Sequence, residues 1–504
     1  MEKRLRIYYT SDLHGQFMPT DYSLLADAKR GLLRLLPEME KDENSLYIDG
    51  GDLLQGSPWV AHCHEKDEVE KIAELMNEAN LDFYALGNHD FNYGASTLAR
   101  YIERNNAVCV TQNVELQDGK LRFPARVHTL PNGLKVGLVG VVTDYIKLWE
   151  RPENLVGINI RDPFEAAKEG LQALKNEADL TVCIYHGGFE RDLETGERQT
   201  EERENIAYQI AEELDFDVLL TAHQHLSIPA QDLHGAIVLQ PAAYGVEMHQ
   251  LDLYWEDSIK RFEWKKIEPI AEPDEERFAP FFAIEEELRE KLNVPLGRLD
   301  RELKAEKPLT MALEEHGLAS LFAAVALEYS GADVVAVSLA QGIPGFEQEV
   351  GVRDVLSNYP YLNHFVILNI TVADLRKAME RSASYFIRDE AGEISVAEDF
   401  LKPKTAHYNY DYYAGIEYTL DLRNKVGERV VSMKKEGREL SDEEKITLCL
   451  SDYRATGTGG YKVYQGQEKS GEFEEQMTEL IFRYFREGKQ NSELAKRKWM
   501  TLIR

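Results

Sequence analysis

A chain of 504 residues is too long for a single hydrophobic core, so we expect two or more domains. Its composition, 43% hydrophobic and 29% charged, is typical of a globular protein and shows no bias towards disorder. The formal net charge of -31 argues against nonspecific binding to nucleic acid or to an anionic membrane, because phosphate groups attract a basic protein face.

The start of the chain and its cysteines indicate an intracellular protein. Met1-Glu2-Lys3-Arg4 leads directly into a predicted strand over 5–9, without the apolar region and cleavage site of a signal peptide. No apolar run is long enough to span a bilayer. Four cysteines in so long a chain do not form a disulfide framework, so we expect free buried thiols. We therefore expect a cytoplasmic protein with no membrane partner.

The first half of the chain alternates short apolar runs with amphipathic stretches, a pattern typical of α/β folds. Helices are predicted over residues 67–79 and 94–105. Strands are predicted over residues 6–9, 45–48, 83–85, 107–111, 135–142, 180–185, 218–221 and 237–240. Polar side chains follow almost every one of these strands. That position matters because ligand sites in open α/β sheets form at the carboxyl ends of the strands.

The composition changes after residue 270, which predicts a first domain over 1–270. Residues 271–295 are acidic and favour helix, and we interpret them as a solvated linker helix. Residues 296–504 read as a second domain of mixed helices and strands. This second domain contains an aromatic cluster over 408–413 and a glycine-rich stretch over 456–460.

Five short segments at strand ends carry the side chains that bind divalent cations. They are Asp12-Leu13-His14-Gly15, Gly50-Gly51-Asp52, Gly87-Asn88-His89-Asp90, Tyr185-His186-Gly187-Gly188 and His223-Gln224-His225. Carboxylate, imidazole and amide oxygen suit Mn²⁺, Zn²⁺, Fe²⁺ or Co²⁺, and two such ions need a shared carboxylate, for which Asp52 is the natural candidate. Each segment alone also fits an ordinary turn or surface histidine, but five in this order favour a two-metal site. His62-Cys63-His64 lacks partners nearby in sequence, and we interpret it as surface.

The order D-x-H…GD…GNH(D/E)…H…GH-x-H resembles that of the calcineurin-like metallophosphoesterases, with Ala222 in place of the glycine before the last histidine pair. Residues 51–58 are similar to the 5'-nucleotidase branch, and the resemblance covers essentially the whole chain. It implies an α/β (α+β) fold: a four-layer metallophosphoesterase β-sandwich flanked by helices, a linker helix, and a C-terminal α/β substrate domain.

The resemblance also implies roles for individual residues. One divalent ion would be held by Asp12, His14, Asp52 and His225, and a second by Asp52, Asn88, His186 and His223. His89 would be the catalytic histidine. In 5'-nucleotidases an Asp three residues later backs this histidine, but Asn92 stands here, which is similar to the 2',3'-cyclic-nucleotide 2'-phosphodiesterase/3'-nucleotidase subgroup. An amide can orient an imidazole, but it does not stabilise the charged form as a carboxylate does.

Nucleotide recognition requires contacts to the base, and aromatic faces stack on any base. Tyr453 is our first candidate, and Tyr408 or Tyr410 the second, since residues two apart on a predicted strand face the same side. Tyrosine clusters also pack between strands, so the alternative is a structural role. Arg454 is predicted to contact ribose or phosphate, and Asn92 is also predicted to contact the substrate. The segment 408–411 resembles the cyclic phosphodiesterase motif, whereas 340–344 lacks the arginine that 5'-nucleotidases carry there.

These features predict a dinuclear-metal nucleotide phosphohydrolase that acts on 2',3'-cyclic nucleotides and 3'-nucleotides. A hydroxide held between the two ions would attack phosphorus in line. The alternatives are a 5'-nucleotidase, a broader phosphomonoester or sugar-nucleotide hydrolase, and a non-catalytic nucleotide sensor. The expected partner is a small nucleotide substrate rather than a nucleic acid, and the oligomeric state is left open.

Overall fold

The computed structural model describes residues 2–200, 202–402 and 404–504. The chain forms two compact units, the first ending at Arg289 and the second beginning at Glu290. All four cysteines are buried free thiols, as expected. Among the described helices, none is both long and apolar enough to cross a membrane.

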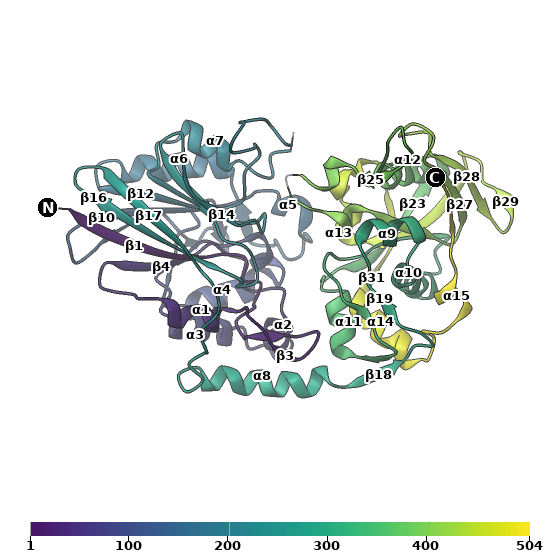
Figure 1. Cartoon of the computed structure of the whole chain (residues 1–504), viewed down its shortest axis with the longest axis horizontal. Coiled ribbons are helices and arrows are strands. Elements are labelled where there is room, and N and C mark those ends of the chain that lie inside the picture. Colours follow the sequence, from purple (N-terminus) through teal and green to yellow (C-terminus); the bar gives the residue numbers. More distant parts are fainter. Residues whose placement is uncertain (1, 201, 403) are drawn as a thin grey trace. The chain divides into compact units, whose positions relative to one another are not determined.

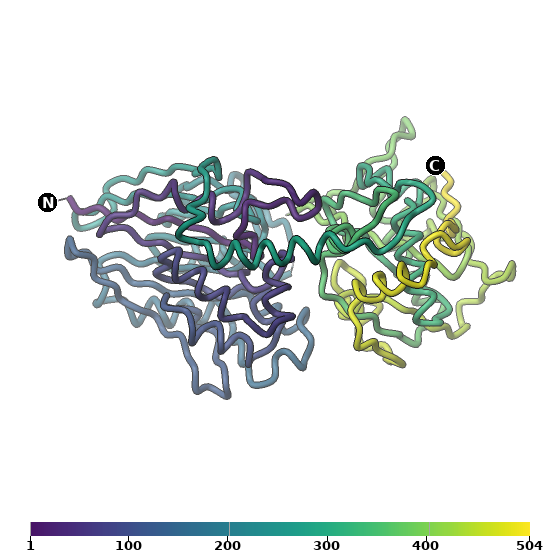
Figure 2. The backbone as a smooth tube through the Cα atoms, turned by 90° about the horizontal axis from the view of Figure 1, so that it is seen from below, coloured from purple at the N-terminus to yellow at the C-terminus, as the bar shows by residue number. Residues whose placement is uncertain are grey.

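The first unit contains two six-stranded sheets. The first sheet has the order β17-β16-β1-β4-β5-β6, with β1 parallel to β4 and antiparallel to β16. Its strands are β1 (Lys3–Thr10), β4 (Ser45–Asp49), β5 (Phe83–Tyr84), β6 (Val108–Cys109), β16 (Met248–Trp255) and β17 (Ile259–Ile267). In Figure 2 the purple N-terminal strand runs beside the teal β16–β17 pair.

The second sheet has the order β14-β15-β13-β12-β10-β9, and its four central strands are parallel to one another, with an antiparallel strand at each edge. Its strands are β9 (Arg126–Thr129), β10 (Lys135–Val142), β12 (Leu180–His186), β13 (Val218–Thr221), β14 (Ile228–Leu233) and β15 (Ala236–Gln240). All eight strands predicted from sequence are present, with ends shifted by at most a few residues, because each is a short apolar run that is buried in a sheet.

The two sheets pack face to face with helices on their outer faces, which confirms the predicted four-layer sandwich (Figure 1). Alternate residues of β1, namely Leu5, Ile7 and Tyr9, point into the core between the sheets. The outer face of the second sheet packs against α6 (Pro163–Leu174) and α7 (Ala207–Glu213). On the other side, α4 (Gly94–Arg104) packs against α3 (Glu70–Glu78), and the ring of its Tyr101 contacts Tyr84 of β5.

Helix α8 (Ala279–Leu292) lies within the segment predicted as a solvated linker helix. One of its acidic side chains differs from that expectation. Glu285 is only 4% exposed, and its carboxylate accepts hydrogen bonds from the hydroxyls of Thr20 and Tyr22 at 2.8 and 2.9 Å. Arg289 is paired with the same carboxylate at 3.1 Å. The helix is therefore anchored to the first unit by buried polar contacts, which composition alone does not reveal.

The second unit has a five-stranded sheet of order β26-β20-β30-β23-β31 and a four-stranded sheet of order β29-β28-β27-β32. The strands of the first are β20 (Val334–Ser338), β23 (His364–Thr371), β26 (Asp411–Ala414), β30 (Lys445–Ser451) and β31 (Glu468–Gln476). Those of the second are β27 (Glu417–Asp421), β28 (Val430–Lys435), β29 (Arg438–Glu439) and β32 (Met500–Ile503). Three longer helices pack around them: the apolar α10 (Gly317–Ser330), α12 (Val372–Ala383) and α14 (Met477–Arg486). The second unit thus mixes helices and strands, which agrees with the predicted α/β class.

Candidate metal centre

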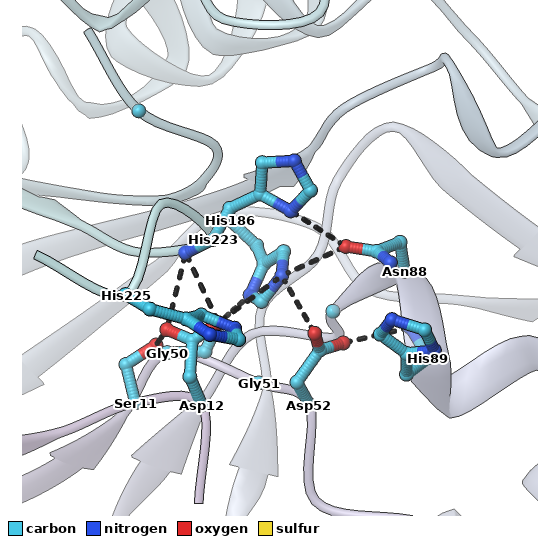
Figure 3. Close-up of polar contacts among 12 residues, drawn as sticks. Ser11, Asp12, Gly50, Gly51, Asp52, Asn88, His89, His186, His223 and His225 are labelled. Carbon is cyan, nitrogen blue, oxygen red and sulfur yellow. Dashed lines mark hydrogen bonds and ion pairs between the residues drawn. The ribbon is translucent and has the colours of Figure 1, made fainter. Parts of the chain in front are cut away.

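The seven predicted metal ligands converge at the carboxyl ends of parallel strands in both sheets. Figure 3 labels all of them except His14. The loops after β1, β4, β5 and β13 supply six of them, and His186 is the last residue of β12. Five of these residues have left-handed backbone conformations: Asp12 (φ 52°), His14 (φ 47°), Asp52 (φ 61°), His223 (φ 72°) and His225 (φ 58°). Side chains other than glycine rarely adopt this conformation, and residues held in it cluster at functional sites. The strained turns are what direct the ligands inward.

One group of ligand atoms gathers Asp12, His14, Asp52 and His225. The Nε2 atoms of His14 and His225 lie 3.1 Å apart. His225 Nε2 is 3.5 Å from Asp12 Oδ1, and His14 Nε2 is 3.7 Å from Asp52 Oδ2. The ligand atoms of Asp12, His14 and His225 all lie within 4.8 Å of one another. One ion could contact all of them.

A second group surrounds Asp52, Asn88, His186 and His223. His186 Nε2 lies 3.3 Å from Asp52 Oδ2 and 3.2 Å from Asn88 Oδ1. His223 Nδ1 lies 2.8 Å from the same Asn88 oxygen. Asp52 therefore adjoins both groups, as expected for a shared carboxylate. Asp12 also reaches the second group, since its Oδ1 lies 4.0 Å from His186 Nε2.

Burial and close contact shift the pKa values of the acidic and imidazole side chains at this site. Asp12 and Asp52 are at most 1% exposed. Burial alone would lower the pKa of His186, but the Asp52 and Asp12 carboxylates raise it to about 10. Burial disfavours ionised Asp52, yet His186, His89 and His14 hold the pKa of Asp52 well below its usual value. The carboxylates thus require positive charge beside them.

The donor set fits divalent cations. Asn88 Oδ1 has only lone pairs, and it faces nitrogens of His186 and His223, so each contact needs either a ring hydrogen or a cation between the atoms. Metal binding requires neutral imidazoles and ionised carboxylates. His186 Nδ1 already donates to the Gly50 carbonyl at 2.7 Å, which leaves Nε2 for a cation. Mixed carboxylate, imidazole and amide ligands suit Mn²⁺, Zn²⁺, Fe²⁺ or Co²⁺.

Two glycines allow the ligand loops to approach one another. A Cβ on Gly87 would lie 2.2 Å from Asp52 Oδ1 and 2.6 Å from His186 Cε1. A Cβ on Gly51, whose φ is +101°, would lie 2.3 Å from the Gly87 nitrogen. A side chain at position 87 would displace the shared carboxylate, and one at position 51 would push apart the loops that carry Asp52 and Asn88.

Asp90 organises the loops, a role that sequence reasoning missed. It is 3% exposed. Its carboxylate accepts hydrogen bonds at 2.7–3.0 Å from four backbone N–H groups, those of Asp52, Leu53, Leu54 and Gly87. Two ligand loops are therefore tied together beneath the site. The only sequence signal was the position of Asp90, directly after His89.

His223 is held on three sides. Trp149 at the end of α5 (Ile146–Trp149) stacks on its ring at a centroid distance of 5.6 Å. Glu204 Oε1 lies 2.8 Å from Nε2, while Nδ1 faces Asn88. The Glu204 carbonyl accepts hydrogen bonds from the hydroxyls of Thr143 and Tyr185, which connects it to β10 and β12. Neither Trp149 nor Glu204 lies within a recognisable motif, so the sequence offered no signal for them.

His89 contacts both Asp52 and Asn92. Its backbone N–H donates to Asp52 Oδ1 at 2.7 Å, and its Nδ1 lies 2.9 Å from Asn92 Oδ1. The amide nitrogen of Asn92 in turn donates to Glu150. Asn92 thus orients the histidine, and its own side chain is engaged by protein groups.

Tyr244 covers the outer edge of the site. Its ring contacts those of His14 and His225 at 5.3 and 5.5 Å, and its N–H donates to the Asp12 carbonyl at 2.9 Å. Glu247 closes the same loop by accepting from the Ala242 N–H at 2.8 Å.

In the second unit the structure revises several predicted substrate contacts. Residues 408 and 410 do not share a strand: η4 covers His407–Asn409, and β26 begins only at Asp411. Tyr410 is 3% exposed and packs against Tyr385, Phe386 and Tyr412, so it presents no free ring face. Tyr408 and Tyr453 are half-buried.

Arg454 is also less available than predicted. It is 4% exposed and paired with Asp411 at 3.0 Å. Its other nitrogens donate to the carbonyls of Thr458 and Tyr408 at 2.8 and 2.9 Å. These contacts make it a structural residue that orders the loop bearing Tyr408, because a guanidinium buried with this many acceptors has few donors left for a substrate.

The interpretation of His62-Cys63-His64 as surface was wrong. Helix α2 (Pro58–Glu65) turns His62 and Cys63 towards the interior, where they are 5% and 1% exposed. His64 stacks on Tyr93 at 3.4 Å, and burial lowers its pKa to about 4. The reason is helical geometry, which buries one face of α2.

Replacing Asp90 should destabilise the first unit and its ligand loops. Asp90→Asn exchanges an acceptor-only group for one that carries two hydrogens, so buried N–H groups lose partners. We expect the free energy of unfolding to fall by about 3 kcal/mol. Urea denaturation of the full chain measures this, with the exposed Asp118→Asn as control. Equal stability of the two variants would contradict the role given to Asp90.

Glu247 should contribute stability that depends on pH. Burial opposes its ionisation, but hydrogen bonds from His249, Ser227 and the Ala242 amide outweigh it and lower the pKa to about 2, from an ordinary 4.5. This contribution is present above pH 4.5 and disappears as the pH falls to about 2. The melting temperature of Glu247→Gln should therefore lie below that of wild type at pH 7, and this gap should close in acid. The exposed control Glu256→Gln should melt with wild type at both pH values. A gap that stays constant from pH 7 to pH 2 argues against this.

Comparisons with known proteins agree with this geometry. Residues 5–227 match the calcineurin-like phosphoesterase family, and residues 295–466 match the 5'-nucleotidase C-terminal domain. The trifunctional nucleotide phosphoesterase of Bacillus subtilis is 24% identical over 91% of this chain, which spans only 36% of that relative. The 2',3'-cyclic-nucleotide 2'-phosphodiesterase/3'-nucleotidase of Salmonella typhimurium is 24% identical over 90% of this chain and 81% of its own length.

A crystal structure of a Staphylococcus aureus protein, described as a candidate 5'-nucleotidase in complex with α-ketoglutarate, is similar over 100% of both chains, with 29% identity and a TM-score of 0.90. Both domain matches follow the order in which the two units occur along the chain. The chain is therefore a phosphoester hydrolase that joins a calcineurin-like phosphoesterase domain to a 5'-nucleotidase C-terminal domain.

Proposed function

We propose that this protein is a dinuclear-metal nucleotide phosphohydrolase that cleaves 2',3'-cyclic nucleotides and 3'-nucleotides. The observation that carries the proposal is the position of Asp52, whose buried carboxylate adjoins two groups of ligand atoms. One ion would be held by Asp12, His14, Asp52 and His225, and the other by Asp52, Asn88, His186 and His223. When bound, two divalent ions supply Lewis acidity and lower the pKa of water.

His89 is proposed as the group that assists the leaving oxygen. Its Nδ1 is engaged with Asn92, which leaves Nε2 for the substrate. Its backbone N–H donates to Asp52, so its position is coupled to that of the shared carboxylate. A neighbouring histidine that gives a proton to a ribose oxygen accelerates departure of a poor leaving group.

The second unit would supply the contacts to the nucleobase. We propose Tyr453 and Tyr408 as the stacking residues, because both rings remain partly exposed. Arg454 would position Tyr408 through its hydrogen bond to that residue's carbonyl. Tyr410 drops out of the proposed contacts because it is buried.

A 5'-nucleotidase is the second candidate. The full-length likeness to the Staphylococcus aureus protein, at a TM-score of 0.90, favours it. Against it stands Asn92 in place of the Asp that backs the histidine in 5'-nucleotidases, together with the missing arginine at 340–344. Substrate preference separates these two possibilities.

A substrate panel tests the proposed function. With added Mn²⁺, we expect higher kcat/KM for 2',3'-cyclic AMP and 3'-AMP than for 5'-AMP. Asp52→Asn should abolish turnover and lower the metal content, and His89→Ala should reduce kcat about a hundredfold or more with the metal content unchanged. Elemental analysis measures the metal, and Asp118→Asn is the control. A preference for 5'-AMP would select the second candidate, and full activity of Asp52→Asn would refute the metal assignment.

Stacking by the tyrosines predicts an effect on KM rather than on kcat. Stacking on one base contributes about 1–3 kcal/mol, so Tyr453→Ala or Tyr408→Ala should raise KM for 3'-AMP about tenfold. Neither should change KM for p-nitrophenyl phosphate, which carries no base. Tyr410→Phe, which keeps the buried ring, should resemble wild type. If both alanine variants leave KM for 3'-AMP unchanged, the base contacts lie elsewhere.

A further inference from the structure

His89, the proposed catalytic histidine, contacts an amide, and a carboxylate lies one hydrogen bond beyond that amide. His89 Nδ1 contacts Asn92 Oδ1 at 2.9 Å, and the Asn92 amide nitrogen donates to Glu150 Oε2. Glu150 follows α5 directly and is the C-terminal cap of that helix. The three side chains form a continuous series of hydrogen bonds from the end of α5 to the proposed catalytic histidine.

Glu150 is itself held in place. Its Oε1 accepts from the Arg151 N–H at 2.8 Å and from Asn154 Nδ2 at 2.7 Å. Asn154 Nδ2 also donates to the Asn92 carbonyl at 2.8 Å. The carboxylate and the backbone of Asn92 are thus bound by the same amide, so neither moves independently of the other.

We propose that Glu150 is a positioning residue for His89, acting through Asn92. This inference rests on the proposed function, in which His89 assists the leaving oxygen. An ionised carboxylate only accepts hydrogen bonds, so the Asn92 NH₂ group must face Glu150 and its Oδ1 must face His89. An amide oxygen accepts only, so Nδ1 of His89 carries the hydrogen and Nε2 is left for the substrate.

The hydrogen bond to Glu150 is what fixes the orientation of the Asn92 amide, so its loss would allow the amide to flip. A flipped amide would present NH₂ to Nδ1, which would then have to accept, and the hydrogen of the neutral ring would move to Nε2. In the intact arrangement Nδ1 keeps its hydrogen throughout. In the acid step the ring enters with a hydrogen on each nitrogen, and the Nε2 proton passes to the ribose oxygen as the P–O bond breaks, which leaves a neutral ring with its hydrogen on Nδ1.

The leaving group reveals whether Glu150 acts through this histidine. A ribose alkoxide needs a proton as it departs, whereas p-nitrophenolate does not. Glu150→Gln should lower kcat/KM for 3'-AMP about tenfold to a hundredfold, with a far smaller effect on p-nitrophenyl phosphate. An equal fall with both substrates, or no fall with either, overturns the proposal.

Exchange of the two side chains provides a rescue test. Asn92→Asp alone should lower kcat/KM for 3'-AMP as Glu150→Gln does, because it places two carboxylates side by side, and these repel each other. The double variant N92D/E150Q restores a carboxylate acceptor for His89 and an amide donor behind it, so it should recover most of the 3'-AMP activity. If the double variant is no more active on 3'-AMP than either single variant, the proposed series of hydrogen bonds from Glu150 to His89 is contradicted. The control is Glu153→Gln, whose side chain is 71% exposed on the same segment, and it should behave as wild type.

A measurement on the zinc-loaded wild-type protein does not depend on any of these variants folding. In ¹⁵N-histidine-labelled protein, the ring resonances of His89, assigned by their loss in His89→Ala, should show a protonated Nδ1. An unprotonated Nδ1 overturns the proposal. If wild type hydrolyses p-nitrophenyl phosphate but no nucleotide, the proposed substrate class fails, and glycerol 2-phosphate then serves as the alkyl ester for the same comparison.

Discussion

Two buried carboxylates that need positive charge beside them determine the arrangement of the catalytic unit. Asp12 and Asp52 lie almost without solvent exposure at the carboxyl ends of β1 and β4, and four of the five imidazoles around them come from other strands or the loops that follow them. A buried charge without a partner is costly, so such a cluster is stable only with compensating cations or protons. The raised pKa of His186, about 10, expresses this need.

The sandwich architecture supplies what this charge cluster requires. Loops from several parallel strands reach one edge, and left-handed turns aim the ligands while glycines let the loops touch. Asp90 then connects two of these loops by accepting four backbone hydrogen bonds, which offsets part of the cost of the strained turns. The hydrogen bonds beneath the site therefore stabilise the strained turns within it.

Around the ligands lies a layer of side chains that orient imidazoles. Glu204 and Trp149 hold His223, Tyr244 covers His14, and Asn92 with Glu150 faces His89. Such partners select which ring nitrogen is free for a cation or a substrate. In this chain they come from the segments that follow β5, β10, β12 and β15.

The sequence by itself determined the α/β class and eight strands of the first unit, and it singled out the candidate ligand residues, because each of these strands is a short apolar run and the candidates stand at strand ends. It did not determine the partners of those ligands. Glu150, Glu204 and Tyr244 lie in loops without periodicity, and only folding brings them to residues far away in the chain. Burial was equally undecidable from sequence: Tyr410, Arg454 and Glu285 are polar or amphipathic residues that the fold encloses. Local pattern encodes secondary structure, whereas long-range packing decides which polar groups lose contact with water.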